Sequence, residues 1–166
     1  LGFIIIGITL VFFPLLSLIT GTNLPIVVVE SCSMYHETSF DDWWSKNAGW
    51  YESNGISKET FKQFSLIGGL NKGDIVFVWG HSNIELGDII IFNALLKYPI
   101  IHRVVELDPL STKGDHNPSQ FPGKVEKEIP KDKVIGKAIG KIPFIGWIKL
   151  IFFESSKPPE SRGLCS

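Results

Sequence analysis

The first part of the chain is apolar and uncharged. Residues 1–29 carry no charged side chain, and residues 1–20 are almost all hydrophobic. A helix needs about 20 apolar residues to cross the hydrocarbon core of a bilayer, so this pattern predicts a transmembrane anchor over 1–20, kinked at Pro14. A cleaved signal peptide and a buried core helix are the alternatives, but a signal peptide would show a basic start and a small-residue cleavage site.

Short β-branched runs bounded by turn residues dominate the chain after this segment, and such runs predict strands. The expected strands cover residues 26–30, 73–79, 87–92, 99–107 and 133–139. Several short strands separated by Gly, Asn and Pro turns are typical of a small β-barrel or sandwich. The pattern therefore predicts a mainly β fold.

Residues 35–70 interrupt this strand pattern. A short helix is expected after Ser57, which would act as its N-cap, with Phe61 and Phe64 on one face. The segment also carries Trp43, Trp44, Trp50 and Tyr51. Such rings suit a membrane-interface belt or a lid, and the alternative is a surface excursion that packs its own aromatic residues. We expect a partly helical insertion.

The end of the chain divides into an apolar and a polar piece. Residues 144–153 are strongly apolar but only about half as long as a membrane span. They suit an interfacial segment, and a core strand or helix is the alternative. Three regions result: the anchor 1–20, a β domain 21–153 with the insertion at about 35–70, and a polar tail 154–166.

Composition excludes several classes of function. The formal net charge of the 166 residues is -1, so nothing indicates a nucleic-acid partner. The two cysteines, Cys32 and Cys165, are too few for a disulfide framework and lack metal-ligand spacing, so we expect free thiols. The four histidines (residues 36, 81, 102 and 116) match no zinc pattern, and no metal or other cofactor is predicted.

Three fragments carry residues capable of nucleophilic catalysis. Ser31 and Ser33 follow a β-run, His102 lies in an expected strand, and Asp115 lies in a Gly-Asp turn. A serine becomes nucleophilic only with a base and an oxyanion hole. Taken singly, a core histidine and a turn carboxylate are the simpler interpretations, so the fragments matter only as a set.

The order and approximate spacing of these fragments resemble the successive boxes of type I signal peptidases. The boxes are Ser31-Cys32-Ser33-Met34, residues 87–92 (Gly-Asp-Ile-Ile-Ile-Phe), 101–105 (Ile-His-Arg-Val-Val), 112–115 (Thr-Lys-Gly-Asp), 134–138 and 142–146. The histidine marks the archaeal and endoplasmic-reticulum branch. The resemblance implies a small signal-peptidase-like β-barrel and a membrane-bound serine endopeptidase that cleaves N-terminal signal peptides from exported proteins.

The resemblance also implies roles for single residues. Ser33 would be the nucleophile, His102 the base and Asp115 its acid partner, while the Ser31 hydroxyl and the Ser33 N–H would form the oxyanion hole. Family members differ in the acid, and Glu126 and Asp132 are the other candidates. Cys32 stands where the family usually has glycine.

The implied partners are signal-peptide-bearing pre-proteins, the lipid bilayer and the protein translocation machinery. A single-pass anchor would hold the catalytic domain on the extracytoplasmic or luminal side. The alternative function is a non-catalytic, membrane-tethered β-barrel binding module, which an activity assay distinguishes.

Overall fold

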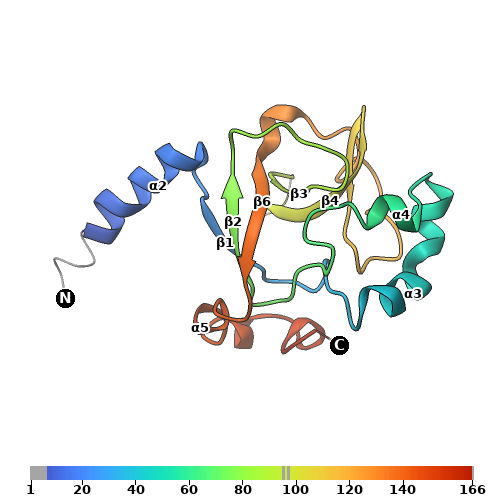
Figure 1. Cartoon of the computed structure of the whole chain (residues 1–166). Coiled ribbons are helices and arrows are strands. Elements are labelled where there is room, and N and C mark those ends of the chain that lie inside the picture. Colours follow the sequence, from blue (N-terminus) through green and yellow to red (C-terminus); the bar gives the residue numbers. More distant parts are fainter. Residues whose placement is uncertain (1–6, 95, 97, 166) are drawn as a thin grey trace.

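A six-stranded antiparallel sheet forms the centre of the molecule, as the computed structural model shows for residues 7–94, 96 and 98–165 (Figure 1). The strands are β1 (Ile26–Val28), β2 (Ile75–Trp79), β3 (Ile89–Phe92), β4 (Ile100–Leu107), β5 (Leu110–Lys113) and β6 (Val134–Ile142), arranged in the order β1-β2-β6-β3-β4-β5. The prediction of a mainly β fold is confirmed. In the described residues the sheet is open, with β1 and β5 at its edges, rather than the closed barrel that was expected.

The middle of the sheet is buried on both faces, since all four residues of β3 are inaccessible. Ile89 and Ile91 belong to one core cluster, which they share with residues of β2 and β6. Ile90 and Phe92 belong to a second cluster, which includes Val104 of β4. Side chains alternate between the two faces of a strand, so the continuous apolar run of β3 fits a strand covered on both sides. This burial fixes β4, its neighbour, which carries His102 opposite Ile90.

The insertion contains two helices, α3 (Phe40–Ser53) and α4 (Lys58–Phe61), which lie on the opposite side of the sheet from α2 (Figure 1). The expected cap is confirmed, because the Ser57 hydroxyl accepts a hydrogen bond from the Thr60 N–H.

The aromatic rings of the insertion pack inward. Trp43, Trp44 and Tyr51 are buried together with Phe61 and with Val105 of β4, while Trp50 is half-buried. A membrane-interface belt would need exposed rings, so this expectation does not hold for the three buried side chains. The structure instead has the alternative arrangement, in which the segment packs its own aromatic residues.

The N-terminal segment forms a π-helical turn, η1 (Ile8–Phe12), followed by α2 (Phe13–Thr20), which projects away from the sheet (Figure 1). Gly21 ends α2 in the left-handed conformation, with φ of 67°. Residues 1–6 of the predicted anchor lie outside the described residues. Within the described part, none of the helices combines the length and the hydrophobicity that a membrane span requires.

The C-terminal part folds into short helical turns. They are α5 (Trp147–Leu150) and the 3₁₀ turns η3 (Glu154–Ser156) and η4 (Pro159–Ser161), while η2 (Lys131–Lys133) precedes β6. Ile148, Ile151 and Phe152 are exposed, and Leu150 is buried. The apolar segment 144–153 is therefore partly core and partly surface.

The expectation of two free thiols is wrong. Cys32 and Cys165 form a disulfide, with a Cα–Cα distance of 5.5 Å, across a sequence separation of 133 residues. The fold places the end of the described chain next to the Ser31–Ser33 turn. The number of cysteines alone cannot predict this proximity, which is why the sequence-based expectation failed.

Candidate active site

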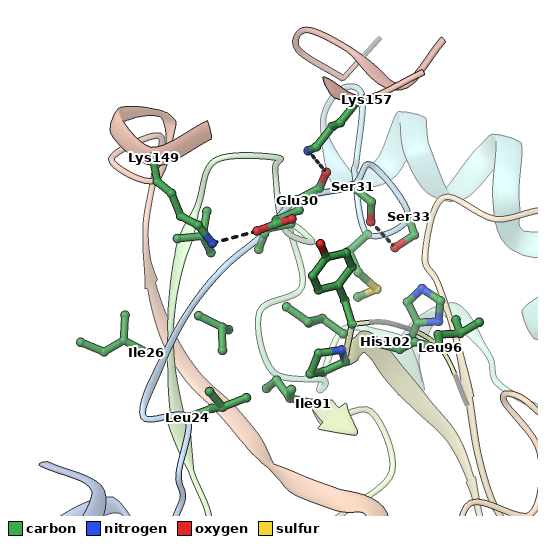
Figure 2. Close-up of a pocket in the computed structure, with 18 of the residues that line it drawn as sticks. Leu24, Ile26, Glu30, Ser31, Ser33, Ile91, Leu96, His102, Lys149 and Lys157 are labelled. Carbon is green, nitrogen blue, oxygen red and sulfur yellow. Dashed lines mark hydrogen bonds and ion pairs between the residues drawn. The ribbon is translucent and has the colours of Figure 1, made fainter. Parts of the chain in front are cut away.

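A groove of about 820 Å³, with mostly apolar walls, runs past the Ser31–Ser33 turn (Figure 2). One wall is the edge strand β1, and another is the first part of β4, up to His102. Ser31 and Ser33 lie at the end of the groove where Glu30 is found. The two hydroxyls and the imidazole predicted to perform the chemistry are therefore lining residues of one cavity.

Hydrogen bonds accepted by its carbonyl groups fix the serine turn in the fold. The Ser33 carbonyl accepts the His116 N–H at 2.8 Å, and the Met34 carbonyl accepts the Leu70 N–H at 2.8 Å. The Met34 side chain is 1% exposed and lies in the central core cluster. This anchoring leaves the Ser33 hydroxyl facing the groove, 3.2 Å from the Ser31 hydroxyl.

His102 is 2% exposed and comes to the groove from β4. Its Nδ1 contacts the carboxylate of Glu126, so Nε2 is the nitrogen available for chemistry. A Cβ atom placed on Gly114 would lie 2.8 Å from His102 Nε2 and 2.8 Å from the Ser33 carbonyl oxygen. The absence of a side chain at 114 thus lets the ring and the serine turn approach each other.

The Ser33 hydroxyl and the His102 ring are not hydrogen-bonded to each other in the structure of the described residues. Catalytic hydrogen bonds are often long or misaligned without substrate and tighten in the complex. In the structure the Ser33 hydroxyl is bonded to the Ser31 hydroxyl instead.

Glu126, not Asp115, is the carboxylate at the imidazole. Glu126 is completely buried, with one oxygen at His102 Nδ1 and the other accepting the Phe121 N–H. Both contacts hold the carboxylate in one orientation. Such a carboxylate fixes the histidine tautomer and stabilises the imidazolium that forms when the base takes a proton.

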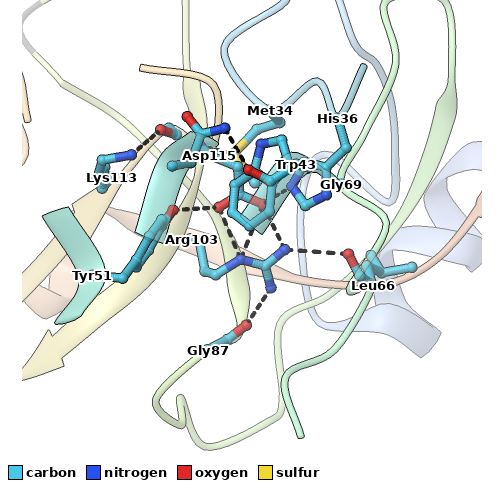
Figure 3. A network of polar contacts seen from close by, with 12 residues as sticks. Met34, His36, Trp43, Tyr51, Leu66, Gly69, Gly87, Arg103, Lys113 and Asp115 are labelled. Carbon is cyan, nitrogen blue, oxygen red and sulfur yellow. Dashed lines mark hydrogen bonds and ion pairs between the residues drawn. The ribbon is translucent and has the colours of Figure 1, made fainter. Parts of the chain in front are cut away.

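Asp115 lies instead at the centre of a buried polar network (Figure 3). Its carboxylate accepts a hydrogen bond from Arg103 Nη2 at 2.7 Å, and it accepts the Tyr51 hydroxyl at 3.0 Å. His36 Nε2 lies 3.0 Å from the same carboxylate. The Arg103 guanidinium also donates to the carbonyl oxygens of Ser65, Leu66 and Gly87. Since His36, Tyr51, Ser65 and Leu66 all belong to the insertion, this network attaches the insertion to β4.

The charges in the network shift each other's protonation. Burial raises the pKa of Asp115, but the Arg103 charge and the hydrogen bonds from His36 and Arg103 outweigh it and hold the pKa well below its usual range. Burial, and then the charge of Asp115, raise the pKa of Tyr51 well above its usual value. Asp115 therefore stays ionised as an acceptor, and the Tyr51 phenol stays protonated as a donor.

The described residues contain no group of three or more His, Cys, Asp or Glu side chains that could hold a metal ion. What the arrangement offers is a hydroxyl, an imidazole with one free nitrogen, a buried carboxylate behind it and a second hydroxyl beside the first. These groups are the components of acyl transfer to a serine.

Comparison with known proteins confirms the resemblance found in the sequence. No family model matches the chain. It is 30% identical over 96 residues to the signal peptidase complex catalytic subunit sec11 of Sclerotinia sclerotiorum. This alignment covers 50% of this chain and 56% of that protein. It is 33% identical over 96 residues to the SEC11 subunit of Candida tropicalis, covering 51% and 58%.

A longer alignment, to the SEC11 subunit of Ogataea parapolymorpha, has 26% identity over 167 residues and covers 87% of this chain and 76% of that protein. In the first two alignments the chain spans a little over half the length of the curated relatives it matches.

Proposed function

We propose that this chain is a membrane-bound serine endopeptidase that removes signal peptides from exported proteins. The observation that carries the proposal is the groove in which Ser33 and His102 are both lining residues, with Glu126 on the far nitrogen of the imidazole. Similarity to subunits named as catalytic in the signal peptidase complex supports the same reaction.

In the proposed reaction, His102 Nε2 removes the proton of the Ser33 hydroxyl as its oxygen attacks the scissile carbonyl. The Ser31 hydroxyl and the Ser33 N–H then stabilise the oxyanion. Breakdown of this intermediate transfers the proton from His102 to the leaving amine and forms an ester on Ser33. Water, activated by the same imidazole, hydrolyses the ester and releases the peptide.

The substrate is proposed to lie extended along β1, since this strand is an edge of the sheet and a wall of the groove. An extended peptide adds to a sheet edge through main-chain hydrogen bonds. The apolar side chains along the groove, among them Ile26, Ile91 and Ile101, suit small apolar residues near the cleavage site.

We propose the location from the disulfide and the N-terminal sequence. A disulfide persists in oxidising compartments and is rare in the cytosol, so the Cys32–Cys165 bond favours an extracytoplasmic or luminal catalytic domain. The anchor 1–20, the β domain 21–153 and the tail 154–166 remain the proposed organisation. Pre-proteins, the bilayer and the translocation machinery are the proposed partners.

The test is cleavage of a signal-peptide-bearing pre-protein by the purified chain in detergent or lipid. Ser33→Ala should abolish cleavage, and His102→Ala should reduce it by several orders of magnitude, because members of a catalytic group act as a unit. Ser119→Ala, at an exposed serine outside the groove, is the matched control and should leave the rate unchanged. A chain that binds pre-proteins without Ser33-dependent cleavage would be the alternative, a non-catalytic binding module.

A further inference from the structure

The C-terminal segment 154–165 folds back onto the turn that carries the two active-site hydroxyls. Cys165 is bonded to Cys32, which lies between Ser31 and Ser33 in the chain. Next to this bond, the Lys157 ammonium donates a hydrogen bond to the Glu30 carbonyl at 3.0 Å (Figure 2). The segment, which we name the clamp, therefore holds the serine turn at two neighbouring positions, one covalently and one through the backbone.

A buried lysine holds the clamp in its folded form. Lys72 is 1% exposed, and its ammonium donates to the Glu154 carboxylate at 2.8 Å, the Ser161 carbonyl at 2.7 Å and the Gly163 carbonyl at 2.9 Å. An ammonium has three donors, and all three meet acceptors of the clamp. A buried cation is costly unless it is paired, and these three bonds offset that cost while attaching the clamp to Lys72.

The charge of Glu154 is also fixed within this arrangement. Burial raises its pKa, but hydrogen bonds from Lys72, from the Gly163 N–H and from Lys157 outweigh it and lower the pKa to about 2. The carboxylate is therefore ionised over the whole range in which a peptidase of this kind would work.

The serine turn needs an external support on its N–H side. In the part of the chain that the structure describes, the backbone N–H groups of Ser31, Cys32 and Ser33 make no hydrogen bond, whereas the carbonyls of Cys32 and Ser33 accept the N–H groups of Tyr35 and His116. An oxyanion hole requires a Ser33 N–H that is not already hydrogen-bonded within the protein. A turn whose N–H groups are left unbonded in this way has fewer hydrogen bonds to hold its backbone rigid. The disulfide at Cys32 supplies a constraint that leaves those N–H groups free.

We propose that the clamp is a positioning element of the active site, and that the Cys32–Cys165 disulfide holds the Ser31–Ser33 turn in the geometry needed for attack and for oxyanion binding. This inference rests on the proposed function. A displacement of about 1 Å in a catalytic group can cost about a hundredfold in rate. The disulfide is attached to Cys32, the residue between both hydroxyls, where it restrains the backbone of the turn directly.

The test compares the oxidised full chain with the same chain reduced by dithiothreitol, using pre-protein cleavage to obtain kcat and KM. We expect reduction to lower kcat by about tenfold to a hundredfold. KM should change by less than about twofold, because β1 and β4 form most of the groove wall and Lys157 is its one lining residue among the described residues of the clamp. Reoxidation should restore kcat. The double variant Cys32→Ser with Cys165→Ser should have the low kcat and no response to dithiothreitol.

Circular dichroism and the melting temperature separate positioning from stability. A disulfide that only stabilises the fold would lower the melting temperature on reduction and leave kcat intact below it. If the reduced chain is folded and has the oxidised kcat, the inference is wrong.

If reduction unfolds the chain, Lys157→Met decides, because its disulfide is intact. Lys157 also lines the groove, so a lowered kcat with unchanged KM supports the clamp. An unchanged kcat, or a change confined to KM, overturns it. Lys46→Met, at an exposed lysine of the insertion, is the control. If the oxidised wild-type chain cleaves no better than Ser33→Ala, the proposed function has failed instead.

Discussion

Replacing Glu126 by glutamine should nearly abolish catalysis without removing any packing. Glutamine has the same shape, but its amide must serve two different neighbours. The Phe121 N–H needs an acceptor, so the amide oxygen turns toward it and the NH₂ group turns toward His102 Nδ1. Nδ1 must then accept a hydrogen bond, which places the ring proton on Nε2, where it blocks uptake of the Ser33 proton.

The size of the effect follows from this change of tautomer. In serine proteases of known mechanism, the equivalent carboxylate-to-amide change lowers kcat by about 10⁴, which corresponds to about 5.5 kcal/mol in the barrier. We expect kcat of Glu126→Gln to fall by about 10³ to 10⁴ in a pre-protein cleavage assay. Because both side chains are buried and equally bulky, the melting temperature should change much less than kcat.

Asp115→Asn is the matched comparison, since it is the same chemical change at the carboxylate that the sequence first suggested. Arg103 would keep a buried charge without an anionic partner, and breaking a buried pair costs about 3–5 kcal/mol. We expect lower stability in urea unfolding and near-normal kcat for the folded protein. The reverse pattern, with kcat lost at Asp115 and kept at Glu126, would return the acid role to Asp115 and refute this reasoning.

Two further changes test the packing around the site. In Gly114→Ala the new Cβ would lie 2.8 Å from both His102 Nε2 and the Ser33 carbonyl, so kcat should fall more than about tenfold with little change in fold; normal kcat would show that ring and turn separate freely. Lys113 is buried, and burial lowers its pKa to about 8. Between about pH 8 and pH 10.4 the unfolded chain therefore binds more protons than the folded chain, so the free energy of unfolding should rise with pH by about 3 kcal/mol. The Tyr51 ring, 4.6 Å from the ammonium, favours the charged form and reduces this rise. Urea unfolding of Lys113→Met should lack this rise.

Local pattern was sufficient for most of the sheet. Four of the expected strands contain β-branched runs long enough to read directly, and β3 is the clearest because its burial on both faces demands an unbroken apolar run. β5 was missed, since Leu110–Lys113 has a polar majority and no alternation that distinguishes it from a turn. It is a strand because β4 offers it a hydrogen-bonding edge, which is a tertiary cause.

The site divides in the same way. Ser33 and His102 were identified by resemblance, and the groove has both in its walls. The acid could not be chosen from the sequence, because several carboxylates follow His102 and only the path of residues 114–133 decides which one returns to the ring. The disulfide has the same origin: the chain must fold before residues 32 and 165 are close enough to bond.

The two carboxylates Asp115 and Glu126 have separate contacts, and those of Asp115 connect the insertion to β4. The Asp115 carboxylate is hydrogen-bonded to Arg103 and to the insertion residues His36 and Tyr51. Both of its oxygens are engaged in these contacts, and within the described residues it is not bonded to the His102 ring. Because Arg103 directly follows His102 on β4, its bonds to Ser65 and Leu66 join the insertion to the strand that carries the proposed base. The insertion is therefore attached to the strand that carries the imidazole, while Glu126 accepts a hydrogen bond from Nδ1–H of His102 and stays ionised.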